Sequence, residues 1–553
     1  MNLYKNSIIN SDKFINSLVI IIAIQILCLF LRFLLPVTHG DALSQYFYDS
    51  LQISRLNNLS IYGFYEMGEY FRTDSLASFY DAFILQISAN WILVRSSRVL
   101  ALLLVVFNSI EFASNLGNIN YKKGVLLAAI ILTLPDVWDI SLSGKHDGYV
   151  LLFELIGIYL MAISVIIKDN YLKIIFSSLS ILVAFVSVGT RLSSLTFLLI
   201  SIFLFSYHVI SSPRKIFLKE LKRFLSTIPL FINLLIISFL ISTFAIAFLN
   251  FKYYSNPLYW LSPPGFLKNL FPNADYLLDY EWAKNNLSLN NIPLIFKPVI
   301  TFLYAVFGVE PIRYGLNKFR ESNELFYTLS NYLNIVGPNW MMVSMHSLSS
   351  FALLPYLNLE NLYNSRKKII IIFLTFWIFL WTLSIPYTRV AIASSLCLVI
   401  LAISESSIFK FNLPKKDYLK PFKFFIISYG FISIFLFTFW SFSTLYDLPL
   451  KSLLNNNSYN RKNLTRDYIL LQNNILGSND NPPTKKFEED WSKIENSYPK
   501  NTLLFLKAPQ KYAYFMDRGL IKSQEKNIRK INLNRKICFE LDSNEIVKNP
   551  NCQ

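Results

Sequence analysis

The chain has 553 residues, of which 53% are hydrophobic and 16% charged, and its formal net charge is +17. A typical soluble domain has roughly 25% charged residues, so the composition excludes an ordinary soluble enzyme and predicts a polytopic membrane protein. The basic residues are not interleaved with aromatic ones as in a nucleic-acid interface, and we expect no nucleic-acid partner. The positive charge suits an anionic lipid surface instead.

Long apolar runs separated by short polar joints predict about eleven membrane-spanning helices, because a span needs about 20 mostly apolar residues. The first run is long and ends in Arg32 and Pro36 without a small-residue cleavage site, so it is interpreted as an anchor and not as a signal peptide. The predicted fold class is an all-α polytopic membrane protein. The expected spans are 18–36, 98–115, 124–140, 148–167, 172–189, 191–210, 227–249, 337–357, 369–386, 388–404 and 422–443.

Lysine and arginine in the short joints predict the orientation, since basic residues stay on the cytoplasmic side of a membrane. With a cytoplasmic N-terminus, all strongly basic joints lie inside, and everything after about residue 444 lies outside. As a default, we expect the membrane to be a bacterial inner (plasma) membrane. The basic joints are Lys122-Lys123, Lys168 with Lys173, 214–223, 366–368 and 410–423.

The first outer loop, 38–97, follows the first span and begins with His39-Gly40-Asp41. Asp41 is either a solvated carboxylate, an N-cap for a helix starting near Ala42, or an interfacial carboxylate kept for function. Further along the loop, 75–94 is predicted as an amphipathic or re-entrant helix and not as a span. Polar residues that include Asp81 interrupt its apolar ones, and hydrocarbon tolerates such residues poorly.

A second polar turn, Gly144-Lys145-His146-Asp147, opens the fourth predicted span on the same outer face. In the simpler interpretation, Asp147 is an N-cap and Lys145 is a cation that snorkels to the interface. In the functional interpretation, the three side chains hold a phosphate beside a carboxylate at a helix N-terminus. Together with Asp41, the turn predicts a cleft just above the bilayer, where a lipid-linked phosphate would lie.

Other polar or reactive side chains in the apolar runs are expected to be structural. Glu111 and Glu154 are predicted as buried carboxylates, with structural hydrogen bonding as their default role. His346 is expected to be a hydrogen-bonded core residue. Cys28 and Cys397 are expected to be small apolar fillers within spans.

The tail of the chain changes character after residue 443, where it becomes polar and rich in asparagine. We therefore divide the chain into a transmembrane domain, 1–443, and a small extracytoplasmic C-terminal domain, 444–553. Cys538 and Cys552 lie in the second domain and could form a disulfide there.

Four features of the chain resemble the GT-C superfamily of integral-membrane glycosyltransferases. That superfamily includes protein mannosyltransferases and the bacterial enzymes that add aminoarabinose or galacturonic acid to lipid A. The resemblance covers about residues 15–210. The features are the Asp41 turn after the first span, an amphipathic first loop ending in Arg98, the Lys122-Lys123 turn and the Gly144-Lys145-His146-Asp147 turn.

The resemblance implies a polyprenyl-phosphate sugar donor bound from the membrane, and a glycan, lipid or protein acceptor that arrives from the outer face. It implies that Asp41 is the catalytic base and Asp147 the acid, with Lys145 and His146 at the donor phosphate. Many members carry two adjacent acidic residues at the first position, whereas Asp41 stands between a glycine and an alanine. We therefore expect no metal and no other cofactor.

The implied chemistry is a single inverting displacement. A partly desolvated Asp41 removes the proton of an acceptor hydroxyl as the hydroxyl attacks the anomeric carbon. The leaving phosphate already carries negative charge and needs cations, for which Lys145, Arg98 and Arg389 are the candidates. Arg98 and Arg389 also have a simpler interpretation, as interfacial anchors near the ends of spans.

Two other function classes share the predicted topology. A non-enzymatic exporter or flippase of lipid-linked sugars would place ionisable groups deep within several spans, whereas here they gather at one interface. A polysaccharide polymerase or ligase would carry its chemistry in the large outer loop, around Arg313, Arg320 and His346.

Overall fold

The structure is a computed structural model in which helices dominate. It describes residues 12–33, 46–54, 72, 75–88, 91–117, 119–134, 137, 140–141, 145–211, 244–259, 262–263, 265–276, 293, 295–298, 367–383, 390–405, 504–506, 528–530, 539–542 and 545–548. The helices are α1 (Asp12–Phe33), α2 (Phe47–Ser54), α4 (Leu76–Ser88), α5 (Trp91–Leu116), α6 (Tyr121–Leu132), α8 (Asp147–Ile166), α9 (Asn170–Thr190), the 3-10 helix η4 (Leu192–Ser194), α10 (Leu195–Ser211), α13 (Gly265–Lys268), α21 (Lys367–Leu383) and α22 (Ile392–Glu405). Residues 244–254 are also helical.

Four helices in the described part of the chain are long and apolar enough to cross a membrane. The membrane-protein class predicted from composition is confirmed to this extent. The expected spans 337–357 and 422–443 lie outside the described residues, and so does most of 227–249, so that eleven spans stay a prediction. The four segments are Asp12–Phe30, Leu93–Leu116, Asp147–Ile166 and Asn170–Thr190.

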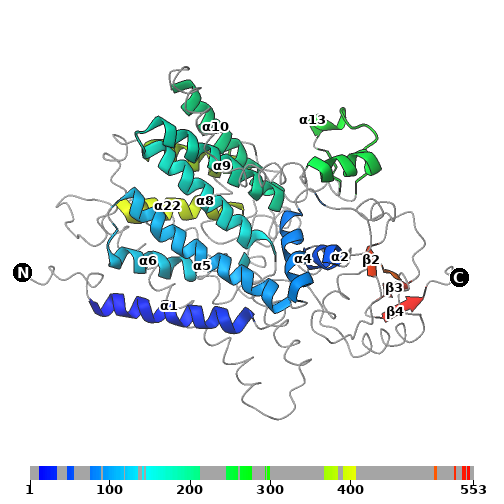
Figure 1. The fold of residues 1–553 in the computed structure, drawn as a ribbon, viewed down its shortest axis with the longest axis horizontal. Coiled ribbons are helices and arrows are strands. Elements are labelled where there is room, and N and C mark those ends of the chain that lie inside the picture. Colours follow the sequence, from blue (N-terminus) through cyan, green and yellow to red (C-terminus); the bar gives the residue numbers. More distant parts are fainter. Residues whose placement is uncertain are drawn as a thin grey trace, which may run out of the picture.

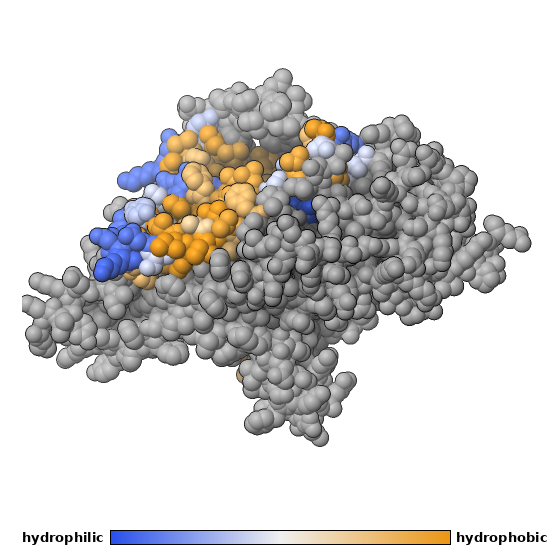
Figure 2. Space-filling view, turned by 90° about the horizontal axis from the view of Figure 1, so that it is seen from below, coloured by the Kyte–Doolittle hydropathy of each residue, from blue (hydrophilic) through white to orange (hydrophobic). Residues whose placement is uncertain are grey.

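The helices pack as a bundle around α8, which contacts α5 on one side and α9 on the other (Figure 1). Helix α6 is buried from Gly124 to Leu132. The outer faces, by contrast, expose large apolar side chains such as Phe83 and Phe107, which are 60% and 64% exposed. Figure 2 shows apolar residues gathered on one such face, with hydrophilic residues at its edge. Apolar patches of this kind suit contact with lipid.

The bundle has two chemically different ends. At one end, Lys123 Nζ donates a hydrogen bond to the Ser404 carbonyl at 3.0 Å, beside Gly117 at the end of α5. At the other end, Arg98 of α5 donates to the Lys145 carbonyl. The stretch of α5 between Arg98 and Gly117 is about 28 Å long, close to the hydrocarbon thickness of about 30 Å. The Lys122-Lys123 joint and the turn before α8 therefore lie at opposite ends of the bundle, as predicted, whereas which end is cytoplasmic stays a prediction.

Two predicted helices have different lengths in the structure. The expected helix 75–94 is divided between α4, which ends at Ser88, and α5, which begins at Trp91. With 13 residues, α4 is about 20 Å long and too short to cross a bilayer. The expected span 124–140 was also wrong, because α6 ends at Leu132 with Thr133 as its C-cap. Pro135 explains this end, since proline disfavours helical backbone in the residue before it and cannot donate a backbone hydrogen bond.

A four-stranded sheet lies in the C-terminal region, which the all-α prediction did not include. The strands are ordered β2-β1-β3-β4, with β1 parallel to β2 and β3, and β3 antiparallel to β4. The chain is therefore mostly helical but not all-α. The strands are β1 (Leu504–Leu506), β2 (Ile528–Lys530), β3 (Phe539–Asp542) and β4 (Glu545–Lys548).

Candidate functional site

A buried ion pair joins α4 to α5. Arg98 Nη2 lies 2.5 Å from Asp81 Oδ2, and Arg98 Nη1 lies 3.5 Å from Asp81 Oδ1. Asp81 shares the buried face of α4 with Ala77 and Leu85, four residues before and after it, and this face packs on α5. A charged pair with two N–H donors on two carboxylate oxygens is among the stronger hydrogen-bonded contacts in proteins.

Two side chains from the turn and first residues of α8 complete the surroundings of Asp81. His146 Nε2 lies 3.3 Å from Asp81 Oδ2, and Tyr149 Oη donates to Asp81 Oδ1 at 3.4 Å. The His146 ring also packs on Tyr46, with ring centroids 4.4 Å apart. Tyr149 Oη makes a second, short hydrogen bond with the Ser97 hydroxyl. Side chains from separate parts of the chain therefore converge on one carboxylate.

The charge state of this cluster follows from burial and from its neighbours. Burial by itself would raise the pKa of Asp81, but the Arg98 guanidinium and His146 outweigh it, and the pKa lies below its ordinary value. Burial lowers the pKa of His146, which Asp81 offsets only in part. Asp81 is thus ionised and His146 neutral at pH 7, with Nε2 donating its proton to the carboxylate. His146 Nδ1 is buried and has no hydrogen-bond partner within the described residues.

The turn that precedes α8 is anchored by Arg98. Arg98 Nε donates to the Lys145 carbonyl at 3.2 Å, and Nη1 donates to the Val94 carbonyl at 2.9 Å. Arg98 is 1% exposed and Lys145 is 3% exposed, so neither is an interfacial side chain that reaches into water. The simpler interpretations of both residues, as an anchor and as a snorkelling cation, are therefore wrong. Their contact with a donor phosphate stays a prediction.

Asp147 opens α8 but does not cap it. The N-cap is His146, which makes no capping hydrogen bond with its side chain, so the N-cap interpretation of Asp147 was wrong. The Asp147 carboxylate instead forms a short ion pair with Nη1 of Arg191, the residue that follows α9. The pair ties the C-terminal end of α9 to the N-terminal end of α8.

The structural expectations for other buried groups are met in part. Glu154 is 4% exposed and accepts a hydrogen bond from Ser194 Oγ at 2.8 Å, as expected for a structural carboxylate. Cys28 and Cys397 are buried, as predicted. Glu111 is exposed, so its prediction as a buried carboxylate was wrong.

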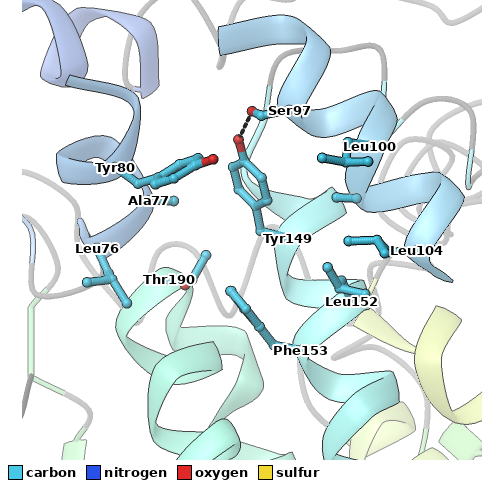
Figure 3. Close-up of a pocket in the computed structure, with 11 residues that line it drawn as sticks. Leu76, Ala77, Tyr80, Ser97, Leu100, Leu104, Tyr149, Leu152, Phe153 and Thr190 are labelled. Carbon is cyan, nitrogen blue, oxygen red and sulfur yellow. Dashed lines mark hydrogen bonds between the residues drawn. The ribbon is translucent and has the colours of Figure 1, made fainter. Parts of the chain in front are cut away.

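A cavity of about 380 Å³ lies between α4, α5, α8 and the end of α9. Figure 3 shows the Tyr80 side chain directed toward the Tyr149 ring, while the Tyr149 hydroxyl points to Ser97, with which it forms a hydrogen bond. Leu100 and Leu104 of the wall are 57% and 40% exposed, so the cavity borders the apolar outer surface. The wall consists of apolar side chains and a few hydroxyls, from Leu76, Ala77, Tyr80, Ser97, Leu100, Ala101, Leu104, Tyr149, Leu152, Phe153 and Thr190.

Tyr149 connects the cavity to the charged cluster, because it both lines the cavity and contacts Asp81. Tyr149 therefore lies between the apolar cavity at the outer surface and the buried charges of Asp81 and Arg98. If the apolar part of an amphiphile entered the cavity from the outer surface of the bundle, its polar part would lie close to these charges.

Two predicted site residues lie outside the described part of the chain. These are Asp41 and Arg389; the expected core residue His346 and the possible disulfide partners Cys538 and Cys552 also lie outside it. The structure therefore brings Arg98, Lys145 and His146 together, and places Asp147 directly after them, but the meeting of Asp41 with Asp147 stays a prediction.

Sequence reasoning missed several residues of this site, among them Tyr149, which lines the cavity and contacts Asp81, and the charged residues Asp81 and Arg191. Asp81 was interpreted only as a polar interruption of an amphipathic helix, although an ionisable residue in an apolar run is itself a signal of function. Arg191 had no comparable signal, because a single arginine between two apolar runs is also typical of an interfacial anchor.

Within the described residues, no group of three or more His, Cys, Asp or Glu side chains lies close enough to hold a metal ion. Comparison of the chain with protein-family models, with curated proteins and with solved structures finds no match.

Proposed function

We propose that the chain is an inverting glycosyltransferase, which moves a sugar from a polyprenyl-phosphate donor to an acceptor hydroxyl at the extracytoplasmic membrane face. The observation that supports this most is the connection of the apolar cavity to the cluster of Asp81, Arg98 and His146 through Tyr149. A lipid-linked sugar needs an apolar surface for its chain and fixed charges for its phosphate. Both are present within one site at the end of the bundle opposite the Lys122-Lys123 joint.

In this proposal the turn before α8 receives the donor phosphate. Lys145 supplies positive charge, and His146 supplies a ring already oriented by Asp81. Arg98 holds the Lys145 carbonyl and so positions the turn. The resemblance to GT-C enzymes supports Asp41 as the base that removes the acceptor proton, and Arg389 as a further cation for the phosphate. The acceptor is a glycan, a lipid or a protein.

The test is sugar transfer by the purified full-length protein in lipid nanodiscs, with a panel of polyprenyl-phosphate sugars and acceptors. We expect Asp41→Asn to lower kcat by about 10²–10⁴-fold, the usual contribution of a general base. The matched control is Asp12→Asn, since Asp12 is 92% exposed and pairs with Lys122, and it should leave the rate unchanged. Thermal unfolding of each variant checks that the fold is intact.

Three results would contradict the proposal. Transfer by Asp41→Asn at a rate near that of the wild type would show that Asp41 is not the catalytic base. A product with retained anomeric configuration would exclude a single displacement. Movement of intact lipid-linked sugars across the membrane, without transfer from any of them, would favour the exporter instead.

A further inference from the structure

We infer that Arg191 binds the donor phosphate and that Asp147 is its positioning residue rather than a catalytic acid. This inference rests on the proposed function and refines the roles within that site. Arg191 is a residue that sequence patterns did not indicate, and its surroundings in the structure are the basis for the assignment.

Arg191 lies next to the cavity and next to the start of α8. Arg191 directly follows Thr190, which lines the cavity, and its guanidinium reaches Asp147 at the start of α8. Asp147 in turn follows Lys145 and His146, the residues that we expect at the phosphate. Arg191 is thus placed between the cavity, where the lipid chain would lie, and the turn that would hold the head group.

The guanidinium groups of Arg98 and Arg191, both at this end of the bundle, differ in exposure and in their partners. The Arg98 side chain is 1% exposed and bonds to Asp81 and to two backbone carbonyls. The Arg191 side chain is 15% exposed, so an incoming ligand can reach it more readily. A guanidinium presents a planar fork of N–H donors that matches two phosphate oxygens, which makes arginine well suited to this contact.

The chain around Arg191 is held against α8. Arg191 has extended backbone, with φ −161° and ψ 127°, and the 3-10 helix η4 follows it at once. Ser194 of η4 donates to Glu154, which lies seven residues after Asp147. Seven residues are about two helical turns, so Asp147 and Glu154 share one face of α8. The chain around Arg191 is therefore fixed to α8 at two points, the Arg191–Asp147 pair and the Ser194–Glu154 hydrogen bond.

The proposed reaction changes the charge of the donor phosphate. The acceptor oxygen forms a bond to the anomeric carbon while the bond from that carbon to the phosphate oxygen breaks. The acceptor proton goes to the base, and the electron pair of the broken bond goes to the phosphate, which changes from one negative charge to two. A cation stabilises this change, whereas no proton donor is required. Asp147 compensates the charge of Arg191 before the lipid arrives, which avoids an unpaired charge in a largely buried site.

The first test measures binding and not activity. The full-length protein in nanodiscs is titrated with farnesyl phosphate and with farnesol, which share a chain and differ in the phosphate. We expect the wild type to prefer the phosphate, and Arg191→Gln to weaken farnesyl phosphate binding about 10–100-fold without changing farnesol binding. Arg191→Lys keeps the charge without the fork and should recover part of the preference. Lys122→Gln, at the opposite end of the bundle, is the matched control.

The second test is a double-mutant cycle on transfer kinetics with Asp147→Asn and Arg191→Gln. A positioning residue acts through its partner, so Asp147→Asn should lower kcat/KM about tenfold alone and have no effect in the Arg191→Gln background. A catalytic acid would lower kcat in both backgrounds, which would overturn the role given to Asp147.

The two tests separate this inference from the proposed function. If the wild type transfers sugar and Arg191→Gln keeps the full preference for farnesyl phosphate, the role of Arg191 is wrong and the function stands. If Arg191→Gln loses the preference but the wild type transfers no sugar, Arg191 binds a lipid phosphate and the glycosyltransferase proposal is wrong. A wild type that binds farnesol and farnesyl phosphate equally would overturn the inference itself.

Discussion

Asp81 and Arg98, on two different helices, form an ion pair in which neither side chain is more than 1% exposed. The pair fixes α4 on α5 beside the cavity and also fixes the turn before α8, since Arg98 bonds to the Lys145 carbonyl. A charged pair without access to water is stable only while both partners are present. The relationship therefore links the stability of the fold directly to the geometry of the candidate site.

We expect Asp81→Asn to lower the free energy of unfolding by about 3–5 kcal/mol, because it leaves the Arg98 charge buried without a counterion. The double variant Asp81→Leu, Arg98→Met should recover most of this loss, since it removes both charges. Thermal unfolding in one detergent, with Asp12→Asn as the exposed control, measures the difference. A Tm of Asp81→Asn equal to that of Asp12→Asn would show that the pair does not stabilise the fold.

The neutral, buried state of His146 predicts a loss of stability in mild acid. Because burial holds the pKa of His146 below its ordinary value of 6.5, the unfolded chain takes up the proton first as the pH falls. Stability is therefore complete above pH 6.5 and decreases as the pH falls from 6.5 toward the pKa of the folded state. Asp81, whose pKa is lowered from 3.8, stays ionised through the upper part of this range.

The measurement is the Tm of the wild type and of His146→Gln between about pH 5 and 7. The variant lacks the titrating group and should lose less stability than the wild type over this range. Parallel curves for the two proteins would mean that His146 does not take up a proton on unfolding.

Leu104→Trp should weaken donor binding by narrowing the cavity. Leu104 lines the cavity and is 40% exposed, so a larger ring can be accommodated without forcing the core apart. We expect the KM for a polyprenyl-phosphate donor to rise about tenfold, equivalent to about 1.4 kcal/mol of binding. Phe107→Trp is the control on the same helix, because Phe107 is 64% exposed and is not among the residues that line the cavity. Equal KM values for the two variants would show that the cavity is not part of the donor-binding site.

Gly157→Ala and Gly124→Ala should have opposite effects on stability. A methyl group at Gly157 would overlap the ring of Phe197, a fully buried residue that stacks on Trp377 with ring centroids 5.3 Å apart. We expect a loss of about 1–3 kcal/mol from this overpacking between α8 and α10.

At Gly124, by contrast, the nearest atom to the added methyl group would be Cγ2 of Ile110, at 3.8 Å, which is an ordinary contact. Alanine is the better helix former there and should stabilise α6 by up to about 1 kcal/mol. Thermal unfolding of both variants tests the pair of predictions, and a destabilised Gly124→Ala would contradict the packing of α6.

The sequence by itself determined that several long apolar segments are helices of spanning length. The predicted spans 148–167 and 172–189 correspond to α8, Asp147–Ile166, and α9, Asn170–Thr190. This works because a backbone in hydrocarbon must satisfy its hydrogen bonds within the segment, so a run of about 20 apolar residues has few alternatives to a helix. The same rule does not place a helix end: the expected span ran on to residue 140, whereas α6 ends at Leu132, before Pro135 and Asp136.

Only the tertiary structure decided which polar side chains meet. Asp81 finds Arg98 and His146 because α4 packs on α5 beside the start of α8, and Asp147 finds Arg191 because α9 returns along α8. The apolar pattern of a helix shows that one of its faces is buried, but it does not say which face of which neighbour covers it. The partner of a buried charge is therefore set by helix packing, and sequence spacing alone does not reveal it.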